Sequence, residues 1–250
     1  MRHRALPVLL LAAAAHGCAS HHALPAVEAN LQRSGVIADP RQAARLARSM
    51  TNGEIAALLD VDVRARLPSA VAVAALTSRC AGFQPVLKPL SAEELAGWAE
   101  AVKAHRDVPG VLPITRLVHR DDRPTLHSLR TAAARLNCEL LLVYLQADSE
   151  VDNYNAAAAL YWTLVGLWLV PGNVYEHQTV MQAILVDCRT GMILGTAAGD
   201  SRRKRLYPLA FKRIQRDRLY GRTAAEALSE LQKSFGLLVG RVAAAAAAKG

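Results

Sequence analysis

Three acidic side chains alternate along the sequence at Asp148, Glu150 and Asp152. If this segment is a β-strand, the alternation puts all three carboxylates on one face, where they could bind a hard cation. Calcium sites, however, use six or more oxygen ligands that come from a turn-rich loop. We therefore predict a solvated strand end and no metal site, with cation binding as the less favoured alternative.

The sequence offers few other arrangements that could support catalysis. It lacks the Gly-x-Ser-x-Gly and His-Glu-x-x-His motifs and the phosphate-binding loop. His119-Arg120-Asp121 copies three letters of the protein-kinase catalytic loop, but the glycine loop and the Asp-Phe-Gly motif are missing, so we interpret it as a turn. We therefore predict a protein that is not an enzyme and that has no catalytic residues and no cofactor.

Nine basic side chains fall between Arg202 and Arg222, and only Asp217 opposes them in that stretch. Positive charge at this density attracts phosphate or carboxylate groups. The alternative is a solvated surface that has no partner. For the first interpretation we assign the anionic contact to six residues: Arg202, Arg203, Lys204, Arg205, Lys212 and Arg213.

The stretch from Asn153 to Tyr175 carries no charge, and its centre at residues 156–170 is rich in large apolar side chains. Fifteen residues are near the lower limit for a membrane span, and Tyr and Trp favour the membrane–water interface. This segment could contact a membrane or a partner, insert into a membrane, or lie buried in the core. The predicted contact residues are Tyr161, Trp162, Leu164, Leu167, Trp168 and Leu169.

The first 18 residues combine a basic start, an uncharged run of about 11 residues and small residues before a cysteine. Such a run is too short to span a bilayer. Because Cys18 directly follows His16-Gly17, the segment resembles a bacterial lipoprotein signal; the alternative is an ordinary secretory signal with a chance cysteine. The resemblance implies that residues 1–17 are removed and that Cys18 carries diacylglyceryl and palmitate chains. Ala19 after the cysteine implies the periplasmic face of the outer membrane.

Composition limits the partners of such a protein. The signal contains Arg2 and Arg4 and no acidic residue, so the mature chain keeps a formal charge of +7 of the +9. This charge favours anionic lipid or cell-wall surfaces, and export argues against nucleic acid. Beyond Cys18 three cysteines remain, which allow one intramolecular bridge at most or serve as small buried apolar residues; they are Cys80, Cys138 and Cys188.

The periodicity of apolar residues predicts helices that flank a sheet. We expect a tether over residues 18–40, a helix over Arg41–Leu59 interrupted at Asn52-Gly53, and a helix that starts from the capping box at Ser91–Glu94 and stops before Pro109. Two further helices are expected over Thr125–Leu136 and Thr223–Val242, followed by a low-complexity tail at residues 243–250.

Strands are predicted where β-branched or continuous apolar runs occur, at 70–74, 111–118 and 139–145. A hairpin is expected from Thr179–Asp187 and Met192–Ala197, with its turn at Arg189-Thr190-Gly191. The predicted fold is a single α+β domain over residues 41–242, three-layer-like, with an apolar insertion at 153–175. Its central mixed sheet ends in a hairpin, is flanked by helices and is followed by a C-terminal helix.

Two segments together resemble a class of periplasmic domain. The first runs from Leu136 to Leu142, and the second is the hairpin sequence from Ala183 to Gly195, whose turn carries Thr190-Gly191. A helix, a buried strand and such a hairpin are similar to the domain shared by curli-secretion lipoproteins and the lipoprotein activators of penicillin-binding proteins. Leu67-Pro68 ahead of Val71 also fits the first strand of that domain.

The chain is also similar to the rhombotarget lipoproteins, which share the lipid signal, the size and an apolar Gly-Leu-Trp-Leu-Val-Pro-Gly-like insertion, here Gly166–Gly172. A rhombosortase target would carry a Gly-rich tail, a membrane helix and basic residues at its C-terminus. This sequence has an Ala-rich run there, so we do not expect C-terminal processing. The resemblance covers about residues 55–240 and implies a fold and a location.

From these features we expect a non-enzymatic, outer-membrane-anchored accessory or assembly factor of the bacterial cell envelope. The alternative is an oligomeric secretion-channel subunit of the curli-secretion type, in which the apolar segment joins a membrane ring. The expected partners are the membrane through the lipid anchor, an unidentified envelope protein, and an anionic lipid or cell-wall surface.

Overall fold

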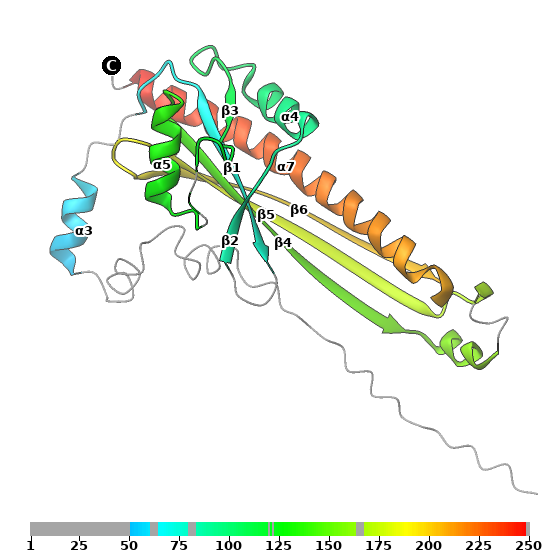
Figure 1. Ribbon diagram of the computed structural model, residues 1–250. Helices are drawn as coiled ribbons and strands as arrows, with labels where there is room; N and C mark the ends of the chain where they lie inside the picture. Colours follow the sequence, from blue (N-terminus) through cyan, green and yellow to red (C-terminus); the bar gives the residue numbers. More distant parts are fainter. Residues whose placement is uncertain are drawn as a thin grey trace, which may run out of the picture.

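The computed structural model describes residues 51–60, 65–79, 84–119, 121, 123–163 and 168–248. The predictions for Cys18, the tether, residues 41–50, Cys80, Leu164 and Leu167 therefore lie outside the described residues. The described chain is built on a six-stranded mixed sheet with the order β2-β1-β4-β5-β6, and β3 pairs with β1 (Figure 1). The predicted α+β class, with a mixed sheet, a hairpin, flanking helices and a C-terminal helix, is confirmed.

The strands fall into a short group and a long group. The short strands are β1 (Val71–Arg79), β2 (Gln84–Lys88) and β3 (Val111–Pro113). The long strands are β4 (Leu140–Tyr154), β5 (Asn173–Asp187) and β6 (Ile193–Tyr207), each of 15 residues. β1 runs parallel to β3 and β4, whereas β4, β5 and β6 form an antiparallel meander.

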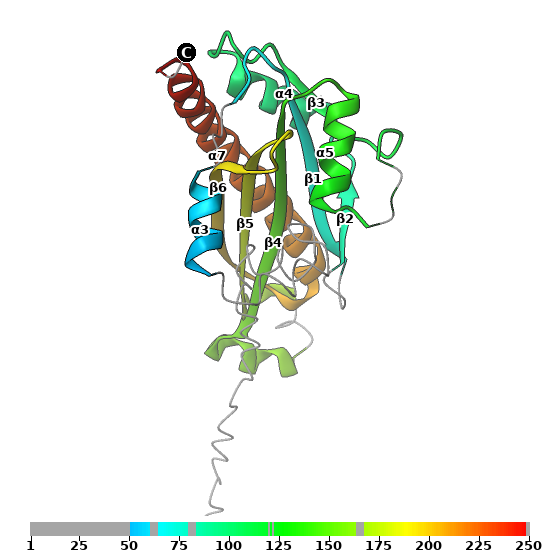
Figure 2. The same cartoon turned by 90° about the vertical axis from the view of Figure 1, so that its left-hand side faces the viewer.

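Helices cover both faces of the sheet where the short strands lie, a region that we term the head (Figure 2). On one face α4 (Ala92–Val102) and α7 (Lys212–Ala248) bury a core in which Trp98 contacts Tyr144 and Phe235. On the other face α5 (Leu126–Arg135) packs on Ala72, Leu141 and their neighbours. The head therefore has the three layers that the sequence predicts.

Local sequence signals set the starts of the two shorter flanking helices. The Ser91 side chain accepts a hydrogen bond from the Glu94 N–H, and the Glu94 carboxylate accepts one from the Ser91 N–H. Thr125 and Ser128 make the same reciprocal pair ahead of α5. Each capping box satisfies backbone donors that a helix N-terminus leaves open. The predicted capping box at Ser91 is thus confirmed.

The three long strands extend well past the predicted boundaries. The sequence predicted strands at 139–145, 179–187 and 192–197, and the structure extends them by nine, six and ten residues at one end. Because β1 pairs with β4 only as far as Gln146, residues 147–154, 173–180 and 200–207 form a separate stalk. These residues are largely polar, so the alternation of apolar residues that indicates a strand is lost there.

Smaller differences concern single elements. The strand predicted at 111–118 ends at Pro113, and the Ile114 N–H just after it still donates to the Val73 carbonyl. The strand β2 was not predicted at all. The helix α3 (Asn52–Leu59) begins at Asn52, so Asn52-Gly53 starts a helix in the structure, where the sequence predicted an interruption.

Two cysteines that the sequence left unassigned lie near the turn of the β5–β6 hairpin. Cys138 is buried and Cys188 is partly buried, and both are free thiols. Burial raises the pKa of the Cys138 thiol, and burial together with the Asp187 carboxylate raises the pKa of Cys188 to about 12. Both thiols are therefore protonated and unreactive at neutral pH, as small buried apolar residues would be.

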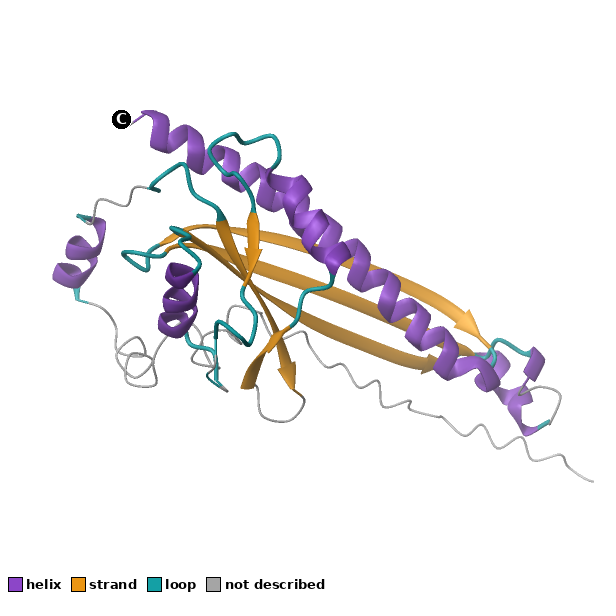
Figure 3. Cartoon of the chain, turned by 45° about the horizontal axis from the view of Figure 1, so that its top comes forward, coloured by secondary structure: helices purple, strands orange, loops and turns teal. Residues whose placement is uncertain are grey.

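The C-terminal helix is the longest element and runs along the full length of the long strands (Figure 3). Its 37 residues span roughly 55 Å, and a 15-residue strand spans about 50 Å. The sequence predicted only Thr223–Val242, because residues 212–222 are rich in charge and show little apolar periodicity. At the C-terminal end the helix continues through the Ala-rich run to Ala248.

The close approach of α7 to β6 depends on Gly199, where an added methyl group would overlap the backbone of Ala227 and Leu231. We expect Gly199→Ala to lower the free energy of unfolding by roughly 1–3 kcal/mol, because the helix must move off the sheet. Gly221→Ala is the matched control, since a methyl group added there, on the exposed side of α7, would have nothing within 4 Å. It should raise stability by about 0.5–1 kcal/mol through helix propensity. Urea unfolding measures the free energy of unfolding of both variants. Equal effects of Gly199→Ala and Gly221→Ala would contradict the close approach of α7 to β6 at Gly199.

Candidate functional site

We term the end of the stalk that lies farthest from the head the tip. It comprises the described residues of the β4–β5 connection, 154–163 and 168–172, together with residues 206–214 of the β6–α7 connection (Figure 1). The 3-10 helix η1 (Ala156–Trp162) lies in the first connection, and η2 (Leu209–Phe211) lies in the second.

Hydrogen bonds across the base of the tip close the β4–β5 connection. The Asn155 N–H donates to the Gly172 carbonyl at 2.9 Å, and the Asn155 amide donates to the Pro171 carbonyl at 2.9 Å. The side-chain oxygen of Asn155 accepts a hydrogen bond from the Ala157 N–H and so caps η1. Asn155 was not among the predicted site residues, although an Asn just before a helix is a recognisable capping signal.

Tyr161, predicted as a contact residue, faces the base of the tip. Its hydroxyl oxygen accepts a hydrogen bond from the Gly172 N–H at 2.8 Å, and the side chain is only partly exposed. A methyl group on Gly172 would lie 2.7 Å from the Tyr161 ring, so glycine is needed for this contact. Tyr161 therefore holds Gly172 at the base of the tip, and its role as a contact residue stays a prediction.

The outer surface of the tip is apolar. Seven of the fourteen large apolar side chains that are exposed in the described chain lie there: Tyr154, Leu160, Trp168, Leu169, Leu206, Phe211 and Ile214. Trp168 meets Phe211 edge to face, with ring centroids 6.0 Å apart, and this contact joins the two connections. None of these residues belongs to a buried cluster, so the described part of segment 156–170 is not core.

Of the six predicted contact residues, Trp168 and Leu169 lie on this surface, at 57% and 72% exposure. Leu164, Leu167 and the Trp162 side chain lie outside the described residues. Phe211, Leu206 and Ile214 were missed, because they come from a segment that is remote in sequence and that the sequence marks mainly by its positive charge.

The predicted basic segment is divided between two elements. Arg202 to Arg205 lie on β6, whereas Lys212 and the basic residues that follow begin α7. The fold also brings acidic residues to them from other strands and helices. The ion pairs are Arg202–Glu176, Arg203–Glu226, Lys212–Asp152 and Arg216–Glu150.

Three of the six predicted anionic-contact residues have no acidic partner in the described chain. No carboxylate in the described chain lies within 4.0 Å of the side-chain nitrogens of Lys204, Arg205 or Arg213, and all three are exposed. By the strand register, Arg205 precedes by two residues the pair Tyr207–Asn173 at the base of the tip. The free cations therefore stand just behind the apolar surface.

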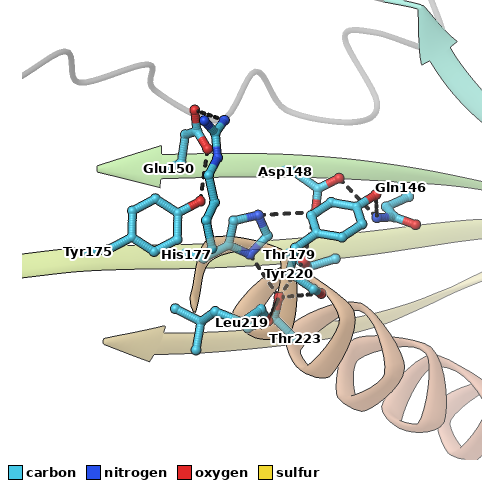
Figure 4. Close-up of polar contacts among 10 residues, drawn as sticks. Gln146, Asp148, Glu150, Tyr175, His177, Thr179, Leu219, Tyr220 and Thr223 are labelled. Atoms are coloured by element: carbon cyan, nitrogen blue, oxygen red, sulfur yellow. Dashed lines mark hydrogen bonds and ion pairs between the residues drawn. The ribbon is translucent and has the colours of Figure 1, made fainter. Parts of the chain in front are cut away.

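The three alternating acids share the face of β4 that α7 covers. They keep 29%, 43% and 27% of their side-chain surface exposed, as the predicted solvated strand end requires, and they also have partners on neighbouring elements. Asp148 accepts a hydrogen bond from the Thr179 hydroxyl at 2.7 Å, and Glu150 accepts one from the Tyr175 hydroxyl at 2.8 Å (Figure 4). Asp152 pairs with Lys212. These partners come from β5 and α7, which the sequence could not place next to β4.

Around Asp148 the side chains form a polar network between the sheet and α7 (Figure 4). His177 is 2% exposed, its Nδ1 lies 2.8 Å from the Thr223 hydroxyl, and its Nε2 lies 3.8 Å from an Asp148 oxygen. The Thr223 hydroxyl donates to carbonyls of the preceding helical turn. These bonds are satisfied when the neutral His177 ring donates from Nδ1 to Thr223.

This network resembles a nucleophile–base–acid arrangement, but its threonines cannot reach a substrate. Thr179 and Thr223 are both 0% exposed. A cleft of about 890 Å³ opens at the network, and its lining includes Asp148 and His177 of the network together with Glu150 and Arg216. Glu150 and Arg216 are paired with each other there. The network thus joins the two strands to the helix.

Metal ligands and membrane spans are also not found among the described residues. No group of three or more His, Cys, Asp or Glu side chains in the described ranges is arranged to hold a metal ion. No helix in the described part of the chain has both the length and the hydrophobicity needed to cross a bilayer.

Comparison with known proteins gives only weak likenesses. No protein-family model matches the chain, and no curated protein matches it. Among solved structures, the dodecamer of a single-residue variant of PelC from Paraburkholderia phytofirmans is 13% identical, with a TM-score of 0.33, over 68% of this chain and 87% of that one. The LpoB C-terminal domain from Salmonella enterica is 12% identical, with a TM-score of 0.29, over 60% and 92%. The lipoprotein GNA1162 from Neisseria meningitidis is 11% identical, with a TM-score of 0.31, over 55% and 84%. At these scores the likenesses decide neither the function nor the assembly of this chain.

The buried His177 makes stability depend on pH. Burial lowers the pKa of His177 below the ordinary 6.5, an effect that Asp148 and Glu150 oppose and Arg216 reinforces. Below pH 6.5 the unfolded chain takes up a proton that the folded chain resists, so stability falls with falling pH until the folded His177 also titrates.

We expect His177→Asn to flatten the dependence of the free energy of unfolding on pH between neutral pH and roughly pH 5, because its amide can still donate to Thr223 but does not titrate. Urea unfolding at a series of pH values measures this. His127→Asn, at an exposed position on α5, is the control and should leave the slope unchanged. A wild-type slope that survives in His177→Asn would show that other groups cause it.

Proposed function

We propose that this protein is a lipid-anchored, non-enzymatic accessory factor of the bacterial cell envelope that works through contacts made by its tip. The observation that carries the proposal is the concentration of exposed apolar side chains at the end of the stalk, outside every buried cluster. Exposed apolar patches of this kind mark interaction sites on soluble domains. The signal-like sequence that ends at Cys18 supports export, lipidation and a position at the periplasmic face of the outer membrane.

The geometry favours contact over catalysis. The stalk holds the tip away from the head, because α7 runs along the long strands and Asn155 and Gly172 close the base. Among the described residues, the arrangement around His177 resembles catalytic machinery, but its two threonines are both 0% exposed. A ring-forming channel subunit would need a tight oligomer and an inserted segment. An accessory factor needs neither, and hydrogen bonds among the described residues hold the base of the tip together.

The lipid anchor is tested by Cys18→Ala. We expect this variant to move from the membrane fraction to the soluble fraction after a high-salt wash, because the acyl chains supply most of the attachment. Cys188→Ala removes a thiol that lies in the folded domain and should stay in the membrane fraction. If the Cys18→Ala protein resists the wash, the main anchor lies elsewhere in the chain.

The contact surface is tested by photo-cross-linking in cells. A benzophenone-bearing amino acid at Leu169 should give adducts with lipid or protein, whereas the same group at Leu237 should give few. The two side chains are 72% and 73% exposed, so the comparison holds accessibility constant while position changes from the tip to the head end of α7. Equal adduct yields at both positions would contradict the assignment of the tip.

A further inference from the structure

We propose that the partner of the tip is a bilayer surface rich in anionic, phosphate-bearing lipid. In this arrangement the apolar side chains enter the boundary between headgroups and acyl chains, and Lys204, Arg205 and Arg213 contact the phosphates. This inference rests on the proposed function, since it takes the tip as the contact surface and names its partner.

The first argument is the composition of the outermost surface. Between Asp152 and Glu176 no residue is charged, so no ionic group of the β4–β5 connection has to leave water when the tip enters an interface. The exposed side chains include the ring pair Trp168–Phe211 and the aliphatic Leu160 and Leu169. Tryptophan is enriched at the membrane–water interface, where its ring is buried and its N–H stays hydrated.

The second argument is the order in which apolar and basic side chains follow one another along the stalk. The strand register puts Tyr207 opposite Asn173 at the base of the tip, with Arg205 and Lys204 two and three residues behind it. Along β6, counted from the tip inward, the apolar Leu206 thus comes first, and the free cations Arg205 and Lys204 follow. A bilayer entered from the water side presents the matching order, with acyl chains deepest and phosphates above them.

The third argument is that positive charge at this end is not neutralised. The three cations have no carboxylate partner in the described chain, and the first turn of α7 contains no acidic residue. A helix N-terminus is itself positive, so Lys212 and Arg213 add to a potential that most helices offset with Asp or Glu. Asp152 offsets only Lys212. The remaining potential complements a phosphate surface.

The test uses residues 19–250, which lack both the apolar signal segment and Cys18, so that the folded domain with its tip supports binding, in co-sedimentation with phospholipid vesicles. We expect binding to vesicles that contain phosphatidylglycerol, much weaker binding to pure phosphatidylcholine, and release by salt. Trp168→Ser with Leu169→Ser should lower the partition coefficient about tenfold or more at any salt concentration. Lys204→Gln with Arg205→Gln should lower it roughly 10- to 30-fold at low salt and little at high salt.

Matched controls change the same residue types away from the tip. Leu237→Ser and Lys233→Gln with Arg241→Gln alter exposed side chains of α7 in the head and should leave binding unchanged. Deletion of residues 156–170 is a second tip variant; it joins Asn155 to Pro171-Gly172 in a short turn, and circular dichroism checks its fold. It should also lose binding.

The outcomes separate this inference from the proposed function. Absent vesicle binding, equal binding to neutral vesicles, or equal losses in the controls would overturn the bilayer as partner. If protein adducts at Leu169 persist in cells in that case, the tip is still a contact surface and its partner is a protein. If the Leu169 adducts also fail, the proposed function fails with it.

Discussion

The match in length between α7 and the three long strands is the constraint on which the structure depends. In the head, apolar residues on both faces of the sheet are covered by α4, α5 and α7. Past Gln146, β4 has no pairing with β1, and the described helices cover one face only. The stalk therefore exists because a single helix reaches as far as the strands do, and because Gly199 lets that helix approach β6. The tip keeps its distance from the head for the same reason.

A sheet covered on one face cannot be held by a large apolar core, and the stalk relies on polar contacts instead. Its apolar cluster consists of Tyr175, Tyr207 and Leu219. The hydrogen bond from Thr179 to Asp148 joins residues that are directly opposite in β4 and β5. Strands that are polar on both faces have a weakly specified register, because a slip of one residue exposes little apolar surface. A buried network whose partners must meet restores that specificity.

The sequence predicted most of the head and little of the stalk. Apolar runs and capping boxes are local signals, and they located β1, the first half of β4, α4 and α5. The stalk is defined by partners that are far apart in sequence, such as Glu150 with Arg216, and no local pattern shows them. The candidate site follows the same division. The uncharged segment 153–175 was visible in the sequence, but Phe211 and Ile214 join it only through the fold.

The basic residues of β6 have a role that the sequence alone did not suggest. β6 is an edge strand, and its outer backbone groups are open to pairing with another strand. Four consecutive basic residues, Arg202 to Arg205, discourage such pairing because a second copy would bring like charges together. Arg202 and Arg203 are then held by Glu176 and Glu226, whereas the two residues nearer the tip have no such partner in the described chain. Protection of the edge strand does not explain why Lys204 and Arg205 have no carboxylate partner, because basic residues that form ion pairs would protect the edge equally well.

Local rules that hold in the head are broken at the tip. The helices α4 and α5 begin with reciprocal caps, and α4 has Glu93 and Glu94 in its first turn. The helix α7 begins with Lys212 and Arg213 and without an acidic residue, next to apolar side chains that remain exposed. Each of these choices costs stability, since cations oppose the helix dipole and exposed apolar surface gains nothing from burial. Because these departures occur together at the tip, they support the proposal that the tip is a contact surface.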